Sequence, residues 1–163
     1  KAKSITVRES NIIYVEQKNK ELGYVGNPTN IDVKLINNFI QKNFVPVVAP
    51  MGLDEKGQAY NINADTAAGA LATNLKSRRL LLMTDVKGVY DENNELISEI
   101  RSAQAEKLIY NEIIHGGMIP KIRTCVNVLN NNVKGVVIID GRKPHSILFE
   151  LFSDQGAGTL IRK

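Results

Sequence analysis

Short apolar runs alternate along the chain with segments whose apolar residues recur at helical spacing. Three of these runs are continuous and lie between polar residues, which is typical of strands buried on both faces of a sheet. They cover 44–50, 79–85 and 135–140. A β-branched and aromatic run at 11–16 predicts one more strand. Shorter extended pieces are expected at 22–26, 96–100 and 156–161.

Helices are predicted between these strands. Asn30 or Asp32 can cap a helix whose apolar face runs from Val33 to Ile40, and Ser102 can cap a later one. Pro120 suits the first turn of another, because its fixed φ is helical and the missing N–H is not needed there. The helices after the first are expected over 63–76, 102–113, 119–129 and 144–152.

A cluster of polar side chains precedes the helix at 63–76. Asn63 has the chemistry of an N-cap, and Asp65 falls in the first turn, where the helix dipole favours negative charge. Together with Asn61, these side chains lie beside backbone donors that suit an anionic ligand. Capping alone is the simpler interpretation of this pattern.

Strands that alternate with amphipathic helices indicate an α/β fold, here a three-layer α/β/α sandwich with a mainly parallel sheet. Ligands bind at the carboxyl ends of the strands in such sheets. Polar groups follow three of the predicted strands. They are Thr84-Asp85, Asp140-Gly141-Arg142 and the cluster at 61–65.

Composition excludes several classes of function. The 163 residues are 43% hydrophobic and 23% charged, as is usual for one globular domain or a large part of one. The net charge of +4 comes without basic blocks, so nucleic-acid binding is not indicated. No apolar run is long enough to span a membrane. The single Cys125 excludes an internal disulfide and suits a reducing compartment, and two His with one Cys make a His/Cys metal site improbable.

Six motifs occur in an order and spacing that resemble one group of enzymes, the acetylglutamate kinases of the amino acid kinase family. They run from about Asn11 to the C-terminus. The motifs are Leu22–Gly26, Val45–Pro50, Tyr60–Ala68, Leu82–Tyr90, Gly116–Lys121 and Ile139–Arg142. The resemblance implies an amino acid kinase-like fold and ATP-dependent phosphorylation of the side-chain carboxylate of N-acetyl-L-glutamate. The product would be N-acetylglutamyl 5-phosphate, in arginine biosynthesis.

The resemblance also implies site residues and cofactors. Lys121 and Asp65 match the catalytic lysine and the aspartate that organises the catalytic lysines, and Asn61 and Asn63 are the predicted substrate-binding residues. ATP and Mg²⁺ are the expected cofactors, and no protein metal ligand is predicted. The residues predicted around the nucleotide are Thr84, Asp85, Lys87, Gly88, Tyr90, Gly116, Gly117 and Met118.

Residues near the start of the chain depart from the family's pattern. Val7-Arg8-Glu9 stands where relatives have a Gly-Lys-Asp run. We therefore expect residues 1–163 to be the C-terminal, nucleotide-binding part of the domain, without the N-terminal substrate-binding half. That half carries a further catalytic lysine, so this chain alone should be inactive.

The C-terminal segment resembles the arginine site of arginine-inhibited members, in which Glu150 and Gly156 would take part. A carboxylate is a natural bidentate partner for a guanidinium. The alternatives are a surface charge at Glu150 and a simple turn at Gly156. The family further implies a homo-oligomer, a dimer or a hexamer, and the PII signalling protein as a possible partner.

Two other functions stay open at this point. One is a non-catalytic module that senses nucleotide or arginine, and the other is a related amino acid kinase. Cytoplasm is the expected location, with the plastid stroma as the alternative, because both are reducing compartments.

Overall fold

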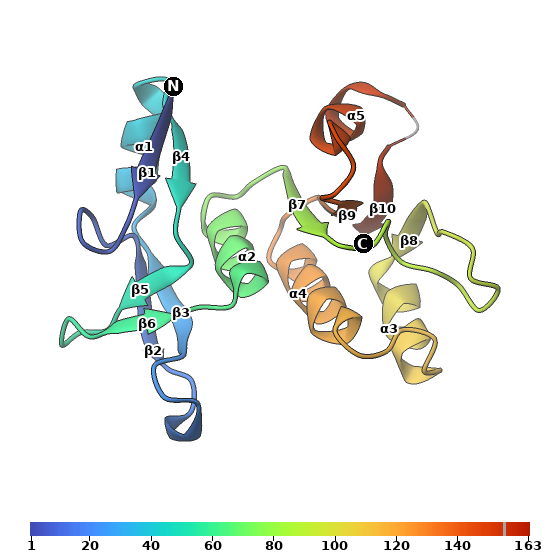
Figure 1. Ribbon diagram of the computed structural model, residues 1–163, viewed down its shortest axis with the longest axis horizontal. Coiled ribbons are helices and arrows are strands. Elements are labelled where there is room, and N and C mark those ends of the chain that lie inside the picture. Colours follow the sequence, from blue (N-terminus) through green and yellow to red (C-terminus); the bar gives the residue numbers. More distant parts are fainter. Residues whose placement is uncertain (155) are drawn as a thin grey trace. The chain divides into compact units, whose positions relative to one another are not determined.

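Figure 1 shows the chain as a computed structural model, which describes residues 1–154 and 156–163. Residue 155, just before the segment predicted at 156–161, lies outside this range. The chain forms two compact units, Lys1–Leu75 and Lys76–Lys163, and each contains strands and helices. Among the described residues, no helix is both long and apolar enough to cross a membrane.

The first unit contains two sheets. β1 (Ala2–Ile5) and β4 (Val45–Val48) pair in parallel, and the other sheet has the order β3-β2-β5-β6. The members of this second sheet are β2 (Ile13–Gln17), β3 (Gly26–Ile31), β5 (Met51–Leu53) and β6 (Ala59–Asn61). A short 3₁₀ helix (Lys20–Leu22) lies between β2 and β3.

The hairpin between β5 and β6 is closed by one side chain. Asp54 Oδ1 accepts hydrogen bonds from the N–H groups of Lys56 and Gln58 at 2.9 and 2.8 Å. Gly57 takes φ +79°, which a glycine adopts without strain. The run Asp54-Glu55-Lys56-Gly57 is typical of a turn and forms one here, but the two short strands beside it were not predicted from the sequence.

The core of the first unit lies under the helices α1 (Val33–Gln41) and α2 (Ala64–Asn74). Its largest fully buried side chains are those of Ile13, Ile36 and Ile62. Asp32 Oδ1 accepts from the Leu35 N–H at 3.0 Å, so of the two predicted caps of α1 the aspartate is the one used. Ile36 is the buried residue of α1, whereas Ile40, at the end of the predicted apolar face, is 48% exposed.

The second unit is built on one mixed sheet with the order β7-β9-β10-β8. β9 pairs in parallel with β7 and antiparallel with β10, and β10 pairs in parallel with β8. Thr84 and Asp140 are register partners, and the Gly141 N–H donates to Thr84 O at 2.8 Å. The strands are β7 (Arg79–Thr84), β8 (Glu99–Arg101), β9 (Gly135–Asp140) and β10 (Gly158–Arg162). Two of the three polar groups predicted at strand ends thus lie together.

Three helices accompany this sheet: α3 (Ser102–Tyr110), α4 (Met118–Asn130) and α5 (Ser146–Phe152). In Figure 1, α3 and α4 lie below the sheet and α5 above it, as a three-layer arrangement requires. α4 buries Ile122, Cys125, Val128 and Leu129, all at most 1% exposed. The α/β fold predicted from the alternation of strands and helices is confirmed.

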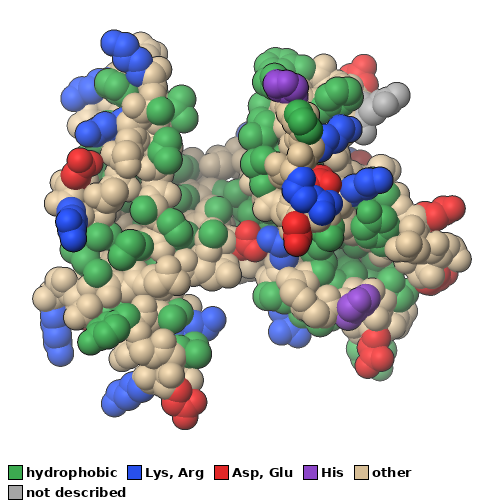
Figure 2. All heavy atoms as spheres, viewed as in Figure 1, with side chains coloured by type: hydrophobic (Ala, Val, Ile, Leu, Met, Phe, Trp, Pro, Cys, Tyr) green, Lys and Arg blue, Asp and Glu red, His purple; other side chains and the backbone are tan. Residues whose placement is uncertain are grey.

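The helix α5 also carries apolar side chains that remain on the surface. Figure 2 shows hydrophobic side chains, in green, gathered over this helix. The exposed ones are Ile147, Leu148, Phe149, Leu151 and Phe152, between 40% and 83% accessible.

Some strand predictions were wrong in detail. β9 is buried on both faces as predicted, but β7 alternates between buried and more exposed positions, so one of its two faces is less covered. In β4, the side chains of Val45 and Val47 are 64% and 54% exposed. The strand expected at 22–26 instead begins at Gly26, as β3, and runs on through Pro28. Proline is tolerated because β3 lies at the edge of its sheet.

Helix limits differ from the predictions mainly at the ends. Ser102 is the first residue of α3 and not its cap, and the Gln104 side chain instead accepts from the Arg101 N–H at 3.1 Å. α3 stops at Tyr110, three residues before its predicted end. Glu112 then takes φ +58°, which a helix cannot contain.

Candidate functional site

The polar cluster of the first unit lies at the junction between β6 and α2. Asn61 is the last residue of β6, and its N–H donates to Tyr24 O at 2.9 Å. Asn63 is the N-cap of α2, with its Oδ1 accepting from the Thr66 N–H at 3.1 Å. Asp65 is in the first helical turn. The predicted cap is confirmed, and the roles in substrate binding and catalysis stay predictions.

Tyr60, next to this cluster, is held by the hairpin turn. Its ring is buried, and its hydroxyl lies 3.4 Å from Asp54 Oδ2. Burial and the neighbouring Asp54 carboxylate raise the pKa of the Tyr60 hydroxyl. The Tyr60 ring also packs against Tyr24, with the ring centroids 5.9 Å apart.

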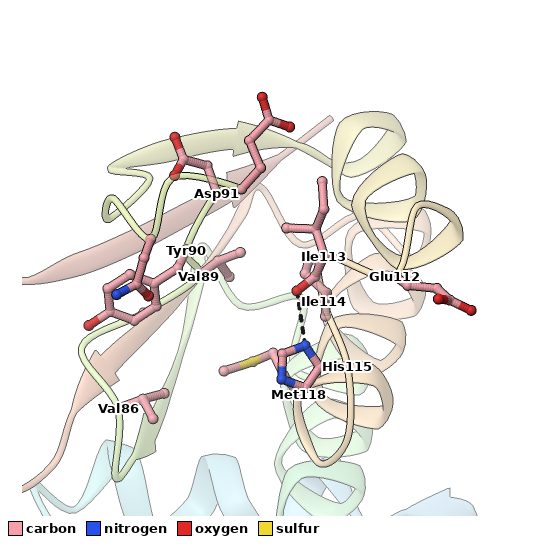
Figure 3. A pocket seen from close by; sticks show the side chains of 12 residues that line it. Val86, Val89, Tyr90, Asp91, Glu112, Ile113, Ile114, His115 and Met118 are labelled. Atoms are coloured by element: carbon pink, nitrogen blue, oxygen red, sulfur yellow. Dashed lines mark hydrogen bonds between the residues drawn. The ribbon is translucent and has the colours of Figure 1, made fainter.

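A cavity of about 550 Å³ opens in the second unit beyond the carboxyl end of β7 (Figure 3). One wall is the segment 86–94, which follows that strand, and the other is the segment 112–118, which joins α3 to α4. Figure 3 shows Val86, Val89 and Tyr90 on one side and Ile113 and Ile114 on the other. Polar groups are added at the rim by Asp91, Glu92, Asn94, Glu112 and His115. Apolar walls with a few polar groups are the usual make-up of a small-molecule site.

The first wall is a loop folded back on itself. The Ile97 N–H donates to Val89 O at 2.9 Å, and the Asp91 N–H donates to Glu95 O at 3.0 Å. The tip is closed by Asp91 Oδ1, which accepts from the N–H groups of Asn93 and Glu95, each at 2.9 Å. An aspartate followed by asparagines is a recognisable turn signal. It could have identified this wall from the sequence.

The second wall has no comparable signal in the sequence. The N–H groups of Ile113 and Ile114 both donate to Leu108 O, at 3.0 and 3.1 Å, which ends α3. His115 Nδ1 lies 3.2 Å from Ile113 O. Gly116 takes φ +57°, so the paired glycines form a tight connection into α4. The contribution of residues 112–115 to the cavity wall was not predicted from the sequence, because no motif marks them.

The residues predicted around the nucleotide are distributed over this region. Gly88, Tyr90 and Met118 line the 550 Å³ cavity, and Gly116 and Gly117 lie in the connection between His115 and Met118. Thr84 is the last residue of β7 and Asp85 follows it; Thr84 Oγ1 donates to Asp85 Oδ1 at 3.2 Å. Lys121 is the fourth residue of α4, after Pro120, so a cation stands in the first turns of a helix whose N-terminus faces anions favourably.

Lys87 lines a different cavity, of about 520 Å³, together with Asp140, Arg142 and Lys143. Arg142 Nε and Nη2 donate to the two oxygens of Asp140, both at 3.0 Å. The Arg142 side chain and backbone N–H, with a smaller contribution from Lys87, lower the pKa of Asp140 to about 2. In Figure 2, acidic and basic side chains lie side by side on this unit.

Glu150 is neither a surface charge nor unpaired, contrary to one alternative. Only 6% of its side chain is exposed, and Oε1 lies 3.1 Å from Arg79 Nη1. Oε2 accepts from the Ala157 N–H at 2.9 Å. Gly156 lies directly against Oε2, since a Cβ there would approach it to 3.2 Å. Glu150 and Gly156, predicted as one site, do line the same cavity of about 230 Å³.

Among the described residues, no group of three or more His, Cys, Asp or Glu side chains is placed to hold a metal ion. Magnesium commonly binds through one or two carboxylates and the phosphates of its nucleotide, so it does not require such a group.

The structure defines a class of protein, an α/β protein with a cavity beyond the carboxyl end of a sheet strand. A solved structure with this fold is smu.665 of Streptococcus mutans UA159. It matches 99% of this chain and 60% of its own, with a TM-score of 0.83 and 31% sequence identity.

The chain belongs to the amino acid kinase family, whose sequence model matches residues 1–140. The acetylglutamate kinase of Pelagibacter ubique (strain HTCC1062) is 58% identical over all 163 residues, which are 57% of its length. That of Bradyrhizobium sp. (strain ORS 278) is 51% identical over 90% of this chain and 49% of its own. The resemblance stated from the motifs is thus confirmed. The chain spans about half the length of the curated relatives it matches.

Proposed function

We propose that the full-length protein transfers a phosphoryl group from ATP to the side-chain carboxylate of N-acetyl-L-glutamate, giving N-acetylglutamyl 5-phosphate in arginine biosynthesis. The observation that carries this proposal is the 58% identity with an acetylglutamate kinase along the whole of this chain. The activity is proposed for the full-length protein and not for residues 1–163 alone, since the chain covers 57% of that relative.

In this proposal the 550 Å³ cavity takes the adenosine part of ATP. Its size falls within the usual range for small-molecule pockets. The apolar side chains of Val89, Ile113 and Ile114 would pack on the faces of the base, and the rim residues would meet its polar edge and the ribose. Thr84 and Asp85, at the end of β7, and Lys87, in the turn that follows, would also contact the nucleotide.

Lys121 is the proposed catalytic cation of this chain. Phosphoryl transfer spreads negative charge over the transferring group, and enzymes catalyse it mainly by positioning and electrostatic stabilisation. A lysine in the first turns of α4 adds a full positive charge to the partial charge of the helix N-terminus. When bound, Mg²⁺ would neutralise charge on the phosphates.

The polar cluster of the first unit would handle the acceptor. Asn61 and Asn63 offer amide donors for the carboxylates of N-acetyl-L-glutamate, and Asp65 is assigned the role of the family's aspartate that organises the catalytic lysines. Because Asn63 already caps α2, its amide nitrogen is the part left to contact substrate.

A coupled kinase assay tests the proposal. The full-length protein is given Mg-ATP with N-acetyl-L-glutamate, and in parallel with aspartate, glutamate, carbamate or UMP. We expect turnover only with the first acceptor. Turnover with another acceptor would favour a related amino acid kinase, and nucleotide binding without any turnover would favour the sensing module.

The Lys121→Ala variant extends the test to the mechanism. Loss of the charge should lower kcat by about 10²- to 10³-fold, the usual effect of removing one group that stabilises the transition state. Arg123→Ala is the matched control, because Arg123 is an exposed cation on the same helix. Equal kcat values for the two variants would contradict the role of Lys121.

Arginine is proposed as an effector at Glu150 and Gly156. The supporting observation is that the buried Glu150 carboxylate already receives a guanidinium, that of Arg79. Free arginine would have to share this carboxylate or replace Arg79. Calorimetry with arginine on the full-length protein tests the idea, and absence of heat at millimolar arginine would contradict it.

The remaining expectations stay predictions. They are a homo-oligomer, a complex with the PII signalling protein, and a location in the cytoplasm or the plastid stroma. Light scattering and a pull-down with purified PII would test the first two.

A further inference from the structure

Thr159, on β10, is buried and lies against the base of the loop that forms one wall of the 550 Å³ cavity. Its side chain is 0% exposed. The Val89 N–H donates to Thr159 Oγ1 at 2.8 Å, and Thr159 Oγ1 donates to Ile97 O at 2.6 Å. One hydroxyl therefore joins the two arms of the loop at the point where the loop leaves the sheet.

This hydroxyl takes the place of a missing backbone hydrogen bond. Val89 and Ile97 face each other, and the Ile97 N–H donates to Val89 O directly. The opposite pair, the Val89 N–H and Ile97 O, is bridged through Thr159 Oγ1. Val89 is 1% exposed, so without the hydroxyl its N–H would be buried without a partner, which is costly.

Two glycines permit the close approach of β10 to the loop. A Cβ on Gly88 would overlap Thr159 Oγ1 and come within 2.9 Å of Leu96 Cδ1. A Cβ on Gly158 would overlap the Ile138 carbonyl and come within 3.0 Å of Lys87 O. Both positions thus leave room only for glycine, and the hydroxyl of Thr159 is placed by this tight contact.

We infer that Thr159 is a positioning residue for the nucleotide pocket. Through its hydroxyl it fixes the segment Gly88–Tyr90 against the sheet, and so sets the pocket wall opposite Ile113. Thr159 does not line the cavity itself and would act only through this segment. The inference rests on the proposed function in one respect, namely that the occupant of the pocket is ATP.

The test compares three variants of the full-length protein. Thr159→Val keeps the shape of the side chain and removes both hydrogen bonds, whereas Thr159→Ser keeps the hydroxyl. Ile161→Val is the matched control. Ile161 is also fully buried on β10, but its side chain is aliphatic and cannot hydrogen-bond to the loop. If Thr159→Val does not fold, Thr159→Ala replaces it, since the smaller side chain leaves space for a bridging water.

Two readouts are measured. We expect Thr159→Val to weaken ATP binding and raise the KM for ATP about tenfold, because both hydrogen bonds that hold this wall are lost, with a smaller change in kcat. Hydrogen exchange should become faster at the Val89 amide. Thr159→Ser should restore both values to within about threefold of the wild type, and Ile161→Val should leave both unchanged.

The outcomes are separable. Unchanged exchange at Val89 in Thr159→Val would overturn the positioning role. Faster exchange with unchanged ATP affinity would overturn its link to the pocket. If the wild type binds no ATP, the proposed function fails together with that link, and exchange alone decides whether Thr159 fixes the segment.

Discussion

At the scale of single residues, two carboxylates that pair with arginines differ in their surroundings. Glu150 is almost fully buried and satisfies both Arg79 and the Ala157 N–H. Glu99 pairs with Arg162 on the surface, where the two side chains are 44% and 52% exposed. The same type of ion pair should therefore contribute differently at the two places.

Glu150→Ala should lower the free energy of unfolding by about 1–3 kcal/mol, because it leaves the Ala157 N–H without its acceptor and Arg79 without its partner. The lower part of this range is expected, since the Arg79 side chain is 42% exposed. Urea unfolding measures the change. Glu99→Ala is the control and should cost less than about 1 kcal/mol; equal losses in the two variants would contradict the argument.

Asp140 gives a prediction for pH. Its folded pKa of about 2 lies below the value near 3.9 of an unfolded chain. The stabilisation from the Arg142 contact is therefore present above pH 4 and is lost as the pH falls toward 2. Carbon NMR of the carboxyl group measures this pKa. In Arg142→Gln it should return toward the ordinary value, and a wild-type pKa near 4 would show that the contact is not formed in solution.

At the scale of elements, the start of α2 depends on one side chain. Asn63→Ala removes the acceptor of the Thr66 N–H and should lower the free energy of unfolding by about 1 kcal/mol, whereas Asn63→Asp should retain most of it. Thermal unfolding of the three proteins is the measurement. A loss in Asn63→Asp as large as in Asn63→Ala would mean that the cap is not what stabilises this helix.

The same scale shows what could be predicted from the sequence. The run Gly135–Asp140 identified β9 to the residue, because a continuous apolar strand between a turn and an aspartate leaves little ambiguity. The strands β5 and β6 have three residues each, too few for any periodicity to show. β3 contains Pro28, and only its position at a sheet edge makes that acceptable.

Some features of the candidate site could likewise be predicted from the sequence, and others could not. Asn63 and Asp65 could be placed because helix caps are local, and the two residues are only two positions apart in the sequence. The contact between Thr159 and Val89 joins residues 70 positions apart, and nothing near Thr159 in the sequence indicates its partner. Long-range contacts of this kind depend on the sheet order, which the pattern of residues did not specify.

At the scale of the whole molecule, the two compact units should respond to different ligands. The proposed nucleotide pocket is lined by residues of the second unit alone, and the polar cluster at 61–65 belongs to the first. In hydrogen-exchange experiments on the full-length protein, Mg-ATP should slow exchange within 86–94 and 112–118. N-acetyl-L-glutamate should instead act on 61–65. Protection by ATP that is absent from both pocket walls would contradict the assignment.

Cys125 is a natural thiol probe of one of these two units. It is the single cysteine of the chain and is fully buried in α4, in the second unit. A thiol reagent can reach it only when the packing of that helix opens. The labelling rate therefore reports how often the second unit opens and does not depend on opening of the first. Adding ATP or arginine during such labelling would report which ligand keeps the unit closed.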